Sequence, residues 1–452
     1  MPAENRNLPR TRRGAATLVR AAGLLAVAGA SLGPTAARAQ SLLELNEGAH
    51  GYDATYLSAR ALADSATYRV EQVRALMRPS ASLSATAGRT ATKPTVGDNF
   101  SSDALSATLS GKQPLFNRAN NTTITQAERT LESSLADLDS AEQDLILRVS
   151  QAYFDVLGAQ DTLETTRANK TAIAEQLASA KRNFEVGTAT ITDTREAQAR
   201  FDLATAQEIA ADNDLVSKRI ALDQLVGRTN VKPRPHAVPI ALPATSNVPL
   251  EELVSRAAEE HPSVRHAQVA YEVAQLETEK ARAQGLPTVD AVASVTGGHG
   301  TIAANATGYN AAGTVGVQIN VPLFAGGSIQ NRIRETIVLE ERSRNDLEAA
   351  RRAVTQATRQ AYYTVQSSAA QVKALEAAEA SSQLALEATE LGYRVGIRVN
   401  VDVLNAQSQL YQTRRDLARA RYDLLLATLR LRQASGRLVA SDVLGIDRLL
   451  VK

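Results

Sequence analysis

The stretch "YRVGIRVNVDVLNAQSQL", residues 393–410, decides the fold because it breaks a helical pattern with a Val-Gly turn and then resumes it. Residues 184–201 read "FEVGTATITDTREAQARF", with an aromatic residue, Val-Gly, an Asp and Ala-Gln in the same order. A tight turn with positive φ favours glycine, so Gly187 and Gly396 are predicted to be turn residues. The chain therefore contains one helix–turn–helix plan twice.

The match extends well beyond the two turns. "QPLFNR" at 113–118 aligns with "VPLFAG" at 321–326, and "QAYFDV" at 151–156 aligns with "QAYYTV" at 360–365. A period of about 200 residues is too long for a solenoid repeat and indicates one internal duplication. The predicted parts are a first structural repeat (40–227), a Pro-rich crossover (228–249), a second structural repeat (250–436) and a C-terminal tail (437–452).

Each repeat shows the same order of predicted elements: a helix, two strands, a very long helix and a further helix. The very long helices, at about 117–184 and 326–393, have apolar residues at three- and four-residue steps between charged ones. At 1.5 Å per residue each would reach roughly 100 Å. The shorter helices are predicted at 42–77, 194–226, 250–284 and 402–435.

The predicted strands have two different faces. "GTVGVQINVPLF" at 313–324 and "ALSATLSGKQ" at 104–113 alternate aliphatic with small polar residues. This alternation, over about ten residues, is typical of strands that span a membrane. The alternative is a small soluble sheet with one face on a core. Open strand edges are not tolerated in lipid, so four strands per chain predict a barrel shared by two or three copies.

The N-terminus and the composition exclude several classes of protein. Residues 1–39 combine a basic lead, an apolar run and Ala37-Arg38-Ala39, which is the pattern of a secretory signal peptide. They contain six Arg and one Glu, so the remaining chain is slightly acidic and is not predicted to bind nucleic acid. The chain has no cysteine, five scattered histidines and no P-loop. We therefore expect no cofactor, no metal site and no enzymatic activity.

These features together resemble the outer-membrane efflux proteins of the TolC type, over essentially all of residues 40–436. The resemblance rests on the duplication, the "PLF" junctions, "HPSVRHAQ" at 261–268 and the turn at 393–410. It implies an α+β fold, in which a homotrimer forms a twelve-stranded outer-membrane β-barrel continuous with a long periplasmic α-helical barrel. It also implies a passive exit duct for drugs or small toxic molecules. The implied partners are a periplasmic adaptor (membrane fusion) protein, an inner-membrane pump that is proton-driven or of the ABC type, and outer-membrane lipid.

The resemblance also assigns roles to residues of the turns, which it implies form an iris-like gate at the periplasmic tip. Asp402 is implied to form a ring at the pore constriction, beside Asn405, where better-known relatives have a second carboxylate. The residues implied to lock the gate are Tyr393 and Arg398 on the second repeat, with Asp193, Thr192 and Gln176 as their partners on the first.

Each assignment has a structural alternative. Asp193 and Asp402 could serve as helix N-caps, and Asp193 with Glu196 fits a capping box. Tyr393 could pack in a helix seam, and Arg398 could be a solvated charge. For the whole protein, the alternatives are an outer-membrane component of type I protein secretion and, from a different class, a periplasmic coiled-coil structural or adaptor protein.

Overall fold

The computed structural model describes residues 40–93, 95–96, 100–235, 249–303 and 306–448. The predicted signal peptide, 1–39, and the middle of the crossover, 236–248, lie outside the described residues. The fold combines long helices with one antiparallel sheet, so the predicted α+β class is confirmed. No helix of the described part is long and apolar enough to cross a membrane.

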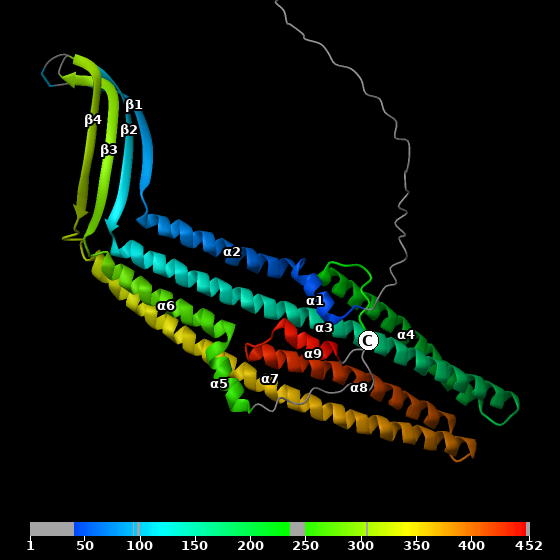
Figure 1. Cartoon of the computed structure of the whole chain (residues 1–452). Coiled ribbons are helices and arrows are strands. Elements are labelled where there is room, and N and C mark those ends of the chain that lie inside the picture. Colours follow the sequence, from blue (N-terminus) through cyan, green and yellow to red (C-terminus); the bar gives the residue numbers. More distant parts are fainter. Residues whose placement is uncertain (1–39, 94, 97–99, 236–248, 304–305, 449–452) are drawn as a thin grey trace, which may run out of the picture. The chain divides into compact units, whose positions relative to one another are not determined.

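The same series of elements occurs twice along the chain (Figure 1). In the first series the helices α2, α3 and α4 flank the strands β1 and β2; in the second, α6, α7 and α8 flank β3 and β4. The bounds are α2 Ala54–Arg74, β1 Ser80–Thr92, β2 Phe100–Phe116, α3 Arg118–Glu185, α4 Ile191–Val226, α6 Pro262–Ala283, β3 Thr288–Ala303, β4 Ala306–Asn320, α7 Ser328–Arg394 and α8 Asn400–Ala434.

Two of the shorter predicted helices are wrong as continuous elements. The prediction over 42–77 is divided into α1 (Leu42–His50), α2 and a short 3-10 helix (Ala75–Met77), because Asp53 is extended and its side chain caps α2. The prediction over 250–284 is divided at His261 into α5 (Leu250–Glu260) and α6. A proline at the next position cannot donate a helical hydrogen bond, so it ends one helix and begins another.

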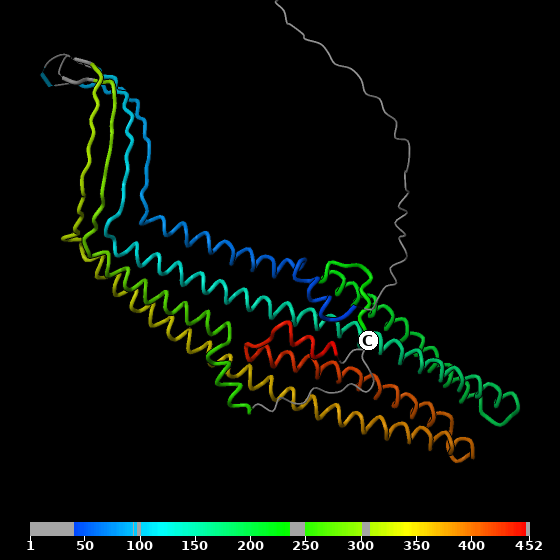
Figure 2. The backbone as a smooth tube through the Cα atoms, in the orientation of Figure 1, coloured from blue at the N-terminus to red at the C-terminus, as the bar shows by residue number. Residues whose placement is uncertain are grey.

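The very long helices match their predicted ranges closely. α3 has 68 residues and α7 has 67, which corresponds to roughly 100 Å each. Each returns through a short turn, α3 into α4 and α7 into α8. The tube in Figure 2 follows these two helical pairs lying side by side. Helix pairs of this length bring the two turns together far from the sheet.

The sheet has the order β1-β2-β3-β4, and every neighbouring pair is antiparallel. The central pairing joins β2 of the first series to β3 of the second. Strands β1 and β4 lie at the two edges and do not pair with each other within the described chain. Their outer backbone groups are therefore available to pair with another strand.

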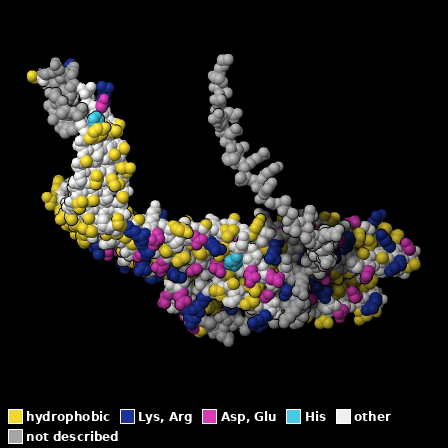
Figure 3. Space-filling model, turned by 45° about the horizontal axis from the view of Figure 1, so that its top comes forward, with side chains coloured by type: hydrophobic (Ala, Val, Ile, Leu, Met, Phe, Trp, Pro, Cys, Tyr) yellow, Lys and Arg dark blue, Asp and Glu magenta, His cyan; other side chains and the backbone are white. Residues whose placement is uncertain are grey.

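Both faces of the sheet are open, and they differ in chemistry. Residues directly opposite in the register lie on one face, so Leu83, Leu109 and Val295 form an aliphatic row across three strands. On the other face Ser82 bonds Ser110, 2.8 Å between the hydroxyl oxygens. Hydrophobic side chains gather over the strands in Figure 3, and charged ones over the helices. No core of the described chain covers this sheet, as the small soluble sheet would require.

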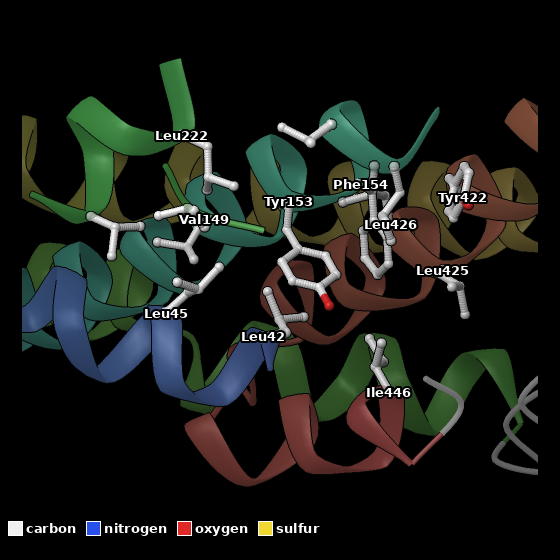
Figure 4. Close-up of a cluster of buried hydrophobic side chains, with 14 of the residues drawn as sticks. Leu42, Leu45, Val149, Tyr153, Phe154, Leu222, Tyr422, Leu425, Leu426 and Ile446 are labelled. Carbon is white, nitrogen blue, oxygen red and sulfur yellow. The ribbon is translucent and has the colours of Figure 1, made fainter. Parts of the chain in front are cut away.

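The largest core lies where short helices pack on the middle of α3 (Figure 4). Tyr153 and Phe154 are almost fully buried there, among leucines and valines of α1, α3, α4 and α8. The predicted tail contributes a helix of its own, α9 (Ala440–Asp447), whose Val443 and Ile446 join this core. The backbone N–H of Leu42 donates to Asp447 Oδ1 at 3.1 Å. Both ends of the described chain are therefore fastened to the same place.

A half-buried carboxylate connects three helices between this core and the sheet. Glu277 of α6 accepts hydrogen bonds from Gln126 of α3 at 2.9 Å, Lys280 at 2.9 Å and Arg332 of α7 at 2.8 Å. Burial raises the pKa of Glu277, but these three donors outweigh it and lower the pKa to about 2. The network therefore contributes stability as long as Glu277 is ionised.

Candidate functional site

The two turns have the same backbone. Gly187 and Gly396 have φ values of 78° and 79°, which L-residues with a side chain rarely adopt. The N–H of Thr188 donates to the carbonyl of Asn183 at 2.8 Å, and at equivalent positions Ile397 donates to Gly392 at 2.8 Å. These bonds close each long helix in the same way. The turns therefore differ in their side chains rather than in their course.

The first turn fixes its aspartate to its own backbone. Thr190 is the N-cap of α4, and its hydroxyl accepts from the N–H of Asp193 at 3.2 Å. Asp193 Oδ2 in return accepts from the N–H of Thr190 at 2.9 Å. This is a capping box with Asp193 at the third helical position. The alternative in which Asp193 is itself the N-cap and Glu196 its partner is wrong, because the helix begins three residues earlier.

The aspartate of the second turn, Asp402, is not part of a capping box. Val399 occupies the position of Thr190, and a valine side chain cannot accept a hydrogen bond. Asp402 therefore lies in the first turn of α8 without a capping partner, where a negative charge still favours the positive end of the helix dipole. Its carboxylate lies 3.6 Å from Arg398 Nη1. The replacement of threonine by valine is the sequence difference that releases Asp402.

The predicted locking residues meet other partners in this structure. The Tyr393 hydroxyl accepts from Asn183 Nδ2 at 3.3 Å, which connects α7 to α3. Arg398, in the turn before α8, pairs with Asp402 in the first turn of that helix. Thr192 is exposed and Gln176 is half-buried on the first helical pair. The roles predicted for Thr192, Gln176 and Asp193 as partners of the lock therefore stay predictions.

Asn405 has a cationic partner that the sequence did not indicate. Arg200 of α4 donates from Nη2 to Asn405 Oδ1 at 2.8 Å. The two residues are 205 positions apart in the sequence, so no local pattern could have connected them. Arg200 also lines a cavity of about 160 Å³ between α3, α4 and α8, together with Ser408 and Tyr411.

Leu404 is a second residue that sequence reasoning missed. It is 0% exposed, and it belongs to a cluster whose other members come from α3 and α4, among them Ile173, Leu177 and Ala197. It is thus the only residue of the second helical pair that the structure places in this cluster, within the part of the chain described. A leucine among the apolar positions of an amphipathic helix gives no sequence signal of such a contact.

Asn400, the first residue of α8, is buried without a hydrogen-bond partner. It is 3% exposed, and within the described chain neither Oδ1 nor Nδ2 has a partner. A buried polar group left unpaired costs about 1–3 kcal/mol. The second helix start is therefore less stable than the first, which has its capping box. Within the described residues no group of three metal-binding side chains is found.

The sequence has close relatives among bacterial channel proteins. The sequence model of the family described as "Outer membrane efflux protein" matches residues 53–228 and 253–437. The chain is 34% identical to the outer membrane protein TolC of Vibrio cholerae serotype O1, over 90% of this chain and 93% of that protein. It is 35% identical to the alkaline protease secretion protein AprF of Pseudomonas aeruginosa, over 75% of this chain and 71% of that protein.

The fold also agrees with a solved structure. The outer membrane protein VceC of Vibrio cholerae superposes with a TM-score of 0.74, covering 88% of this chain and 96% of that one at 18% identity. The predicted outer-membrane localisation is confirmed by this relationship, and the alternative of a periplasmic coiled-coil or adaptor protein is wrong. The chain therefore belongs to the outer membrane efflux protein family, and it is an outer-membrane exit channel rather than an enzyme.

Proposed function

We propose that three copies of the chain form one tunnel, with a twelve-stranded barrel in the outer membrane. The observation that carries this proposal is the sheet: four strands, one aliphatic face and two open edges, β1 and β4. An open edge in lipid leaves backbone groups without partners, so β1 of one copy must pair with β4 of the next. Three copies agree with the resemblance described above, and the aliphatic face contacts outer-membrane lipid.

The helical part would extend from the membrane into the periplasm and meet the other components there. Helices α3 and α7, roughly 100 Å long, would bring the two turns close to the inner membrane. The partners are a periplasmic adaptor protein and an inner-membrane pump, which supplies the energy. We also propose that the two repeats, 40–227 and 250–436, arose by duplication, which the repeated order of elements supports.

The gate of this tunnel would be at the turns. Asp402 and Asn405 line the constriction, and the α7–α8 pair moves away from α3–α4 when the channel opens. Three contacts hold the pairs together near the tip: Tyr393 with Asn183, Arg200 with Asn405, and Leu404 in its apolar cluster. The contrast between the two aspartates supports the assignment of the second pair as the moving one, because only Asp193 is tied to its own backbone.

The test is channel formation by the purified protein. We expect a trimer that resists SDS until heated, fractionates with the outer membrane and conducts ions in planar lipid bilayers. Tyr393→Phe combined with Arg398→Ser should raise the single-channel conductance, because the first change removes the hydrogen bond to Asn183 and the second removes the ion pair that holds Asp402. A monomeric protein without conductance would contradict the proposal, and an unchanged conductance in the double variant would contradict the lock.

Two classes of cargo remain to be separated. The first class is small toxic molecules. The second is proteins exported in one step, which the similarity to AprF, named for alkaline protease secretion, favours. Deletion of the gene should raise sensitivity to dyes and detergents in the first case. It should abolish the appearance of a protease or another protein in the medium in the second, with drug sensitivity unchanged.

A further inference from the structure

We propose that Arg200 determines the ion selectivity of the gate, and that with Arg398 it makes the constriction favour anionic solutes over cations. This inference rests on the proposed function, in which Asp402 and Asn405 line the narrowest part of the tunnel. It adds a residue from the first repeat, whose position in the sequence gives no sign of a role in the pore. It also predicts a class of cargo.

Arg200 forms no ion pair with any described residue, so it brings an uncompensated charge to the constriction. Its Nη2 donates to Asn405 Oδ1 at 2.8 Å, so the guanidinium is held beside that side chain. The amide accepts the hydrogen bond, but it is neutral and cannot cancel the positive charge. A carboxylate at the same place would have formed a neutral ion pair. Asparagine in place of such a carboxylate therefore leaves one more unit of positive charge in each copy.

Asp402 does not offset this charge, because it already has a partner. Arg398 Nη1 lies 3.6 Å from Asp402 Oδ2, one helical turn away in α8. The pair is neutral as a whole, and the carboxylate, which is in no capping box, remains free to hold this position. Per copy the constriction thus has Asp402 and Arg398, which cancel, and Arg200, which does not.

The rest of the tip supplies no large opposing field. Segments 181–200 and 387–405, which contain both turns, have six Lys or Arg and six Asp or Glu between them. Distant exposed charges are screened within about 8–10 Å at physiological salt. Groups at the narrowest point therefore dominate, since a constriction with low-dielectric walls concentrates their field. Three copies of Arg200 around one axis would attract carboxylates, phosphates and sulfonates and would repel cations.

Reversal potentials in a KCl gradient across a planar bilayer test this inference. We expect the wild-type trimer to pass Cl⁻ in preference to K⁺. Arg200→Gln should raise the ratio of K⁺ to Cl⁻ permeability by about twofold, the effect of removing one unit charge several ångströms away in water. Asn405→Asp should raise it similarly, and the double variant should raise it most. Arg200→Lys should preserve the wild-type ratio, because it keeps the charge and alters the hydrogen bond.

The control is Arg195→Gln, an exposed arginine on a different face of the same helix, about 7.5 Å nearer its start. It should leave the ratio unchanged. An Arg200→Gln channel with the wild-type reversal potential would overturn the inference, and so would a wild-type channel that prefers K⁺. In both cases the protein still conducts, whereas absence of any channel in the wild-type trimer would overturn the proposed function instead. Asn405→Asp keeps the test decisive if Arg200→Gln fails to assemble.

Discussion

Truncation of Leu404 gives the sharpest test of how the gate is held shut. The Leu404 side chain comes from α8 and is completely buried in a cluster of α3 and α4 residues. If the α7–α8 pair moves outward as a body, this side chain must leave the cluster and meet water. The hydrogen bonds at the tip can exchange with water at little net cost, so the apolar contact is the larger barrier to opening.

The magnitude follows from the burial. Exposing a fully buried leucine costs about 1.5–3 kcal/mol, and Leu404→Ala removes most of that difference between the closed and open states. A change of about 2 kcal/mol per copy shifts the equilibrium of one protomer by roughly 30-fold. The effect on the whole trimer is larger if the three pairs open together. The closed fraction should therefore fall sharply, without any change in the charge of the pore.

The assay is single-channel recording of purified trimers in planar bilayers, with the open fraction as the readout. Leu404→Ala should increase the open fraction, whereas Leu203→Ala, which truncates a leucine of α4 that is 53% exposed, should not. Thermal unfolding in detergent checks that both variants remain folded. If Leu404→Ala trimers are folded and open no more often than wild type, the apolar contact does not hold the gate.

Three further predictions use other parts of the structure. The pKa of Glu277 is lowered to about 2 in the folded chain, so its network stabilises the protein above pH 4.5 and loses this effect as the pH falls towards 2. Glu277→Gln should therefore lower the stability near neutral pH by about 1–2 kcal/mol, because solvent reaches part of the carboxylate and screens its contacts, and make little difference near pH 2. An equal deficit at both pH values would contradict this. Asn400→Leu removes a buried unpaired amide, so it should stabilise the closed state and lower the open fraction. Calorimetry should show a more stable trimer. A less stable trimer would mean that the amide has a partner in the trimer. Val399→Thr should give Asp402 the capping role that Asp193 already has and add about 0.5–2 kcal/mol to the start of the helix. Thermal unfolding of the trimer should show this gain, and an unchanged melting temperature would mean that the introduced threonine does not cap the helix.

Periodicity determined most of the architecture in advance. The three- and four-residue steps predicted α3 and α7 nearly to their ends, and the alternation predicted strands with one aliphatic and one hydroxyl face. Both features are local: a helix or strand must present its apolar residues to one side, and the spacing records which side. The duplication also showed that the two turns correspond, with Asp193 and Asp402 at equivalent positions.

The breaks in the shorter helices escaped the same reasoning. Gly51 ends α1 and the Asp53 side chain caps α2, but the prediction over 42–77 did not take these local signals as a break, and the packing of α1 on α3 and α4 adds to them. The tail likewise gave no sign of α9, which is eight residues long and is held in place by the core it covers. Helices of this length are marginal on their own, so tertiary contacts decide whether they form.

The sequence by itself determined which residues stand at the turns, because the glycines and the repeated aspartates are local signals. It could not determine what those residues touch. The contacts of Asn405 with Arg200, of Tyr393 with Asn183 and of Leu404 with the α3–α4 pair each join positions some two hundred residues apart. Such pairs arise from the way two long helical hairpins pack against each other. The packing energy is the total of many weak contacts between segments that are far apart in the sequence, so no single stretch of sequence determines it.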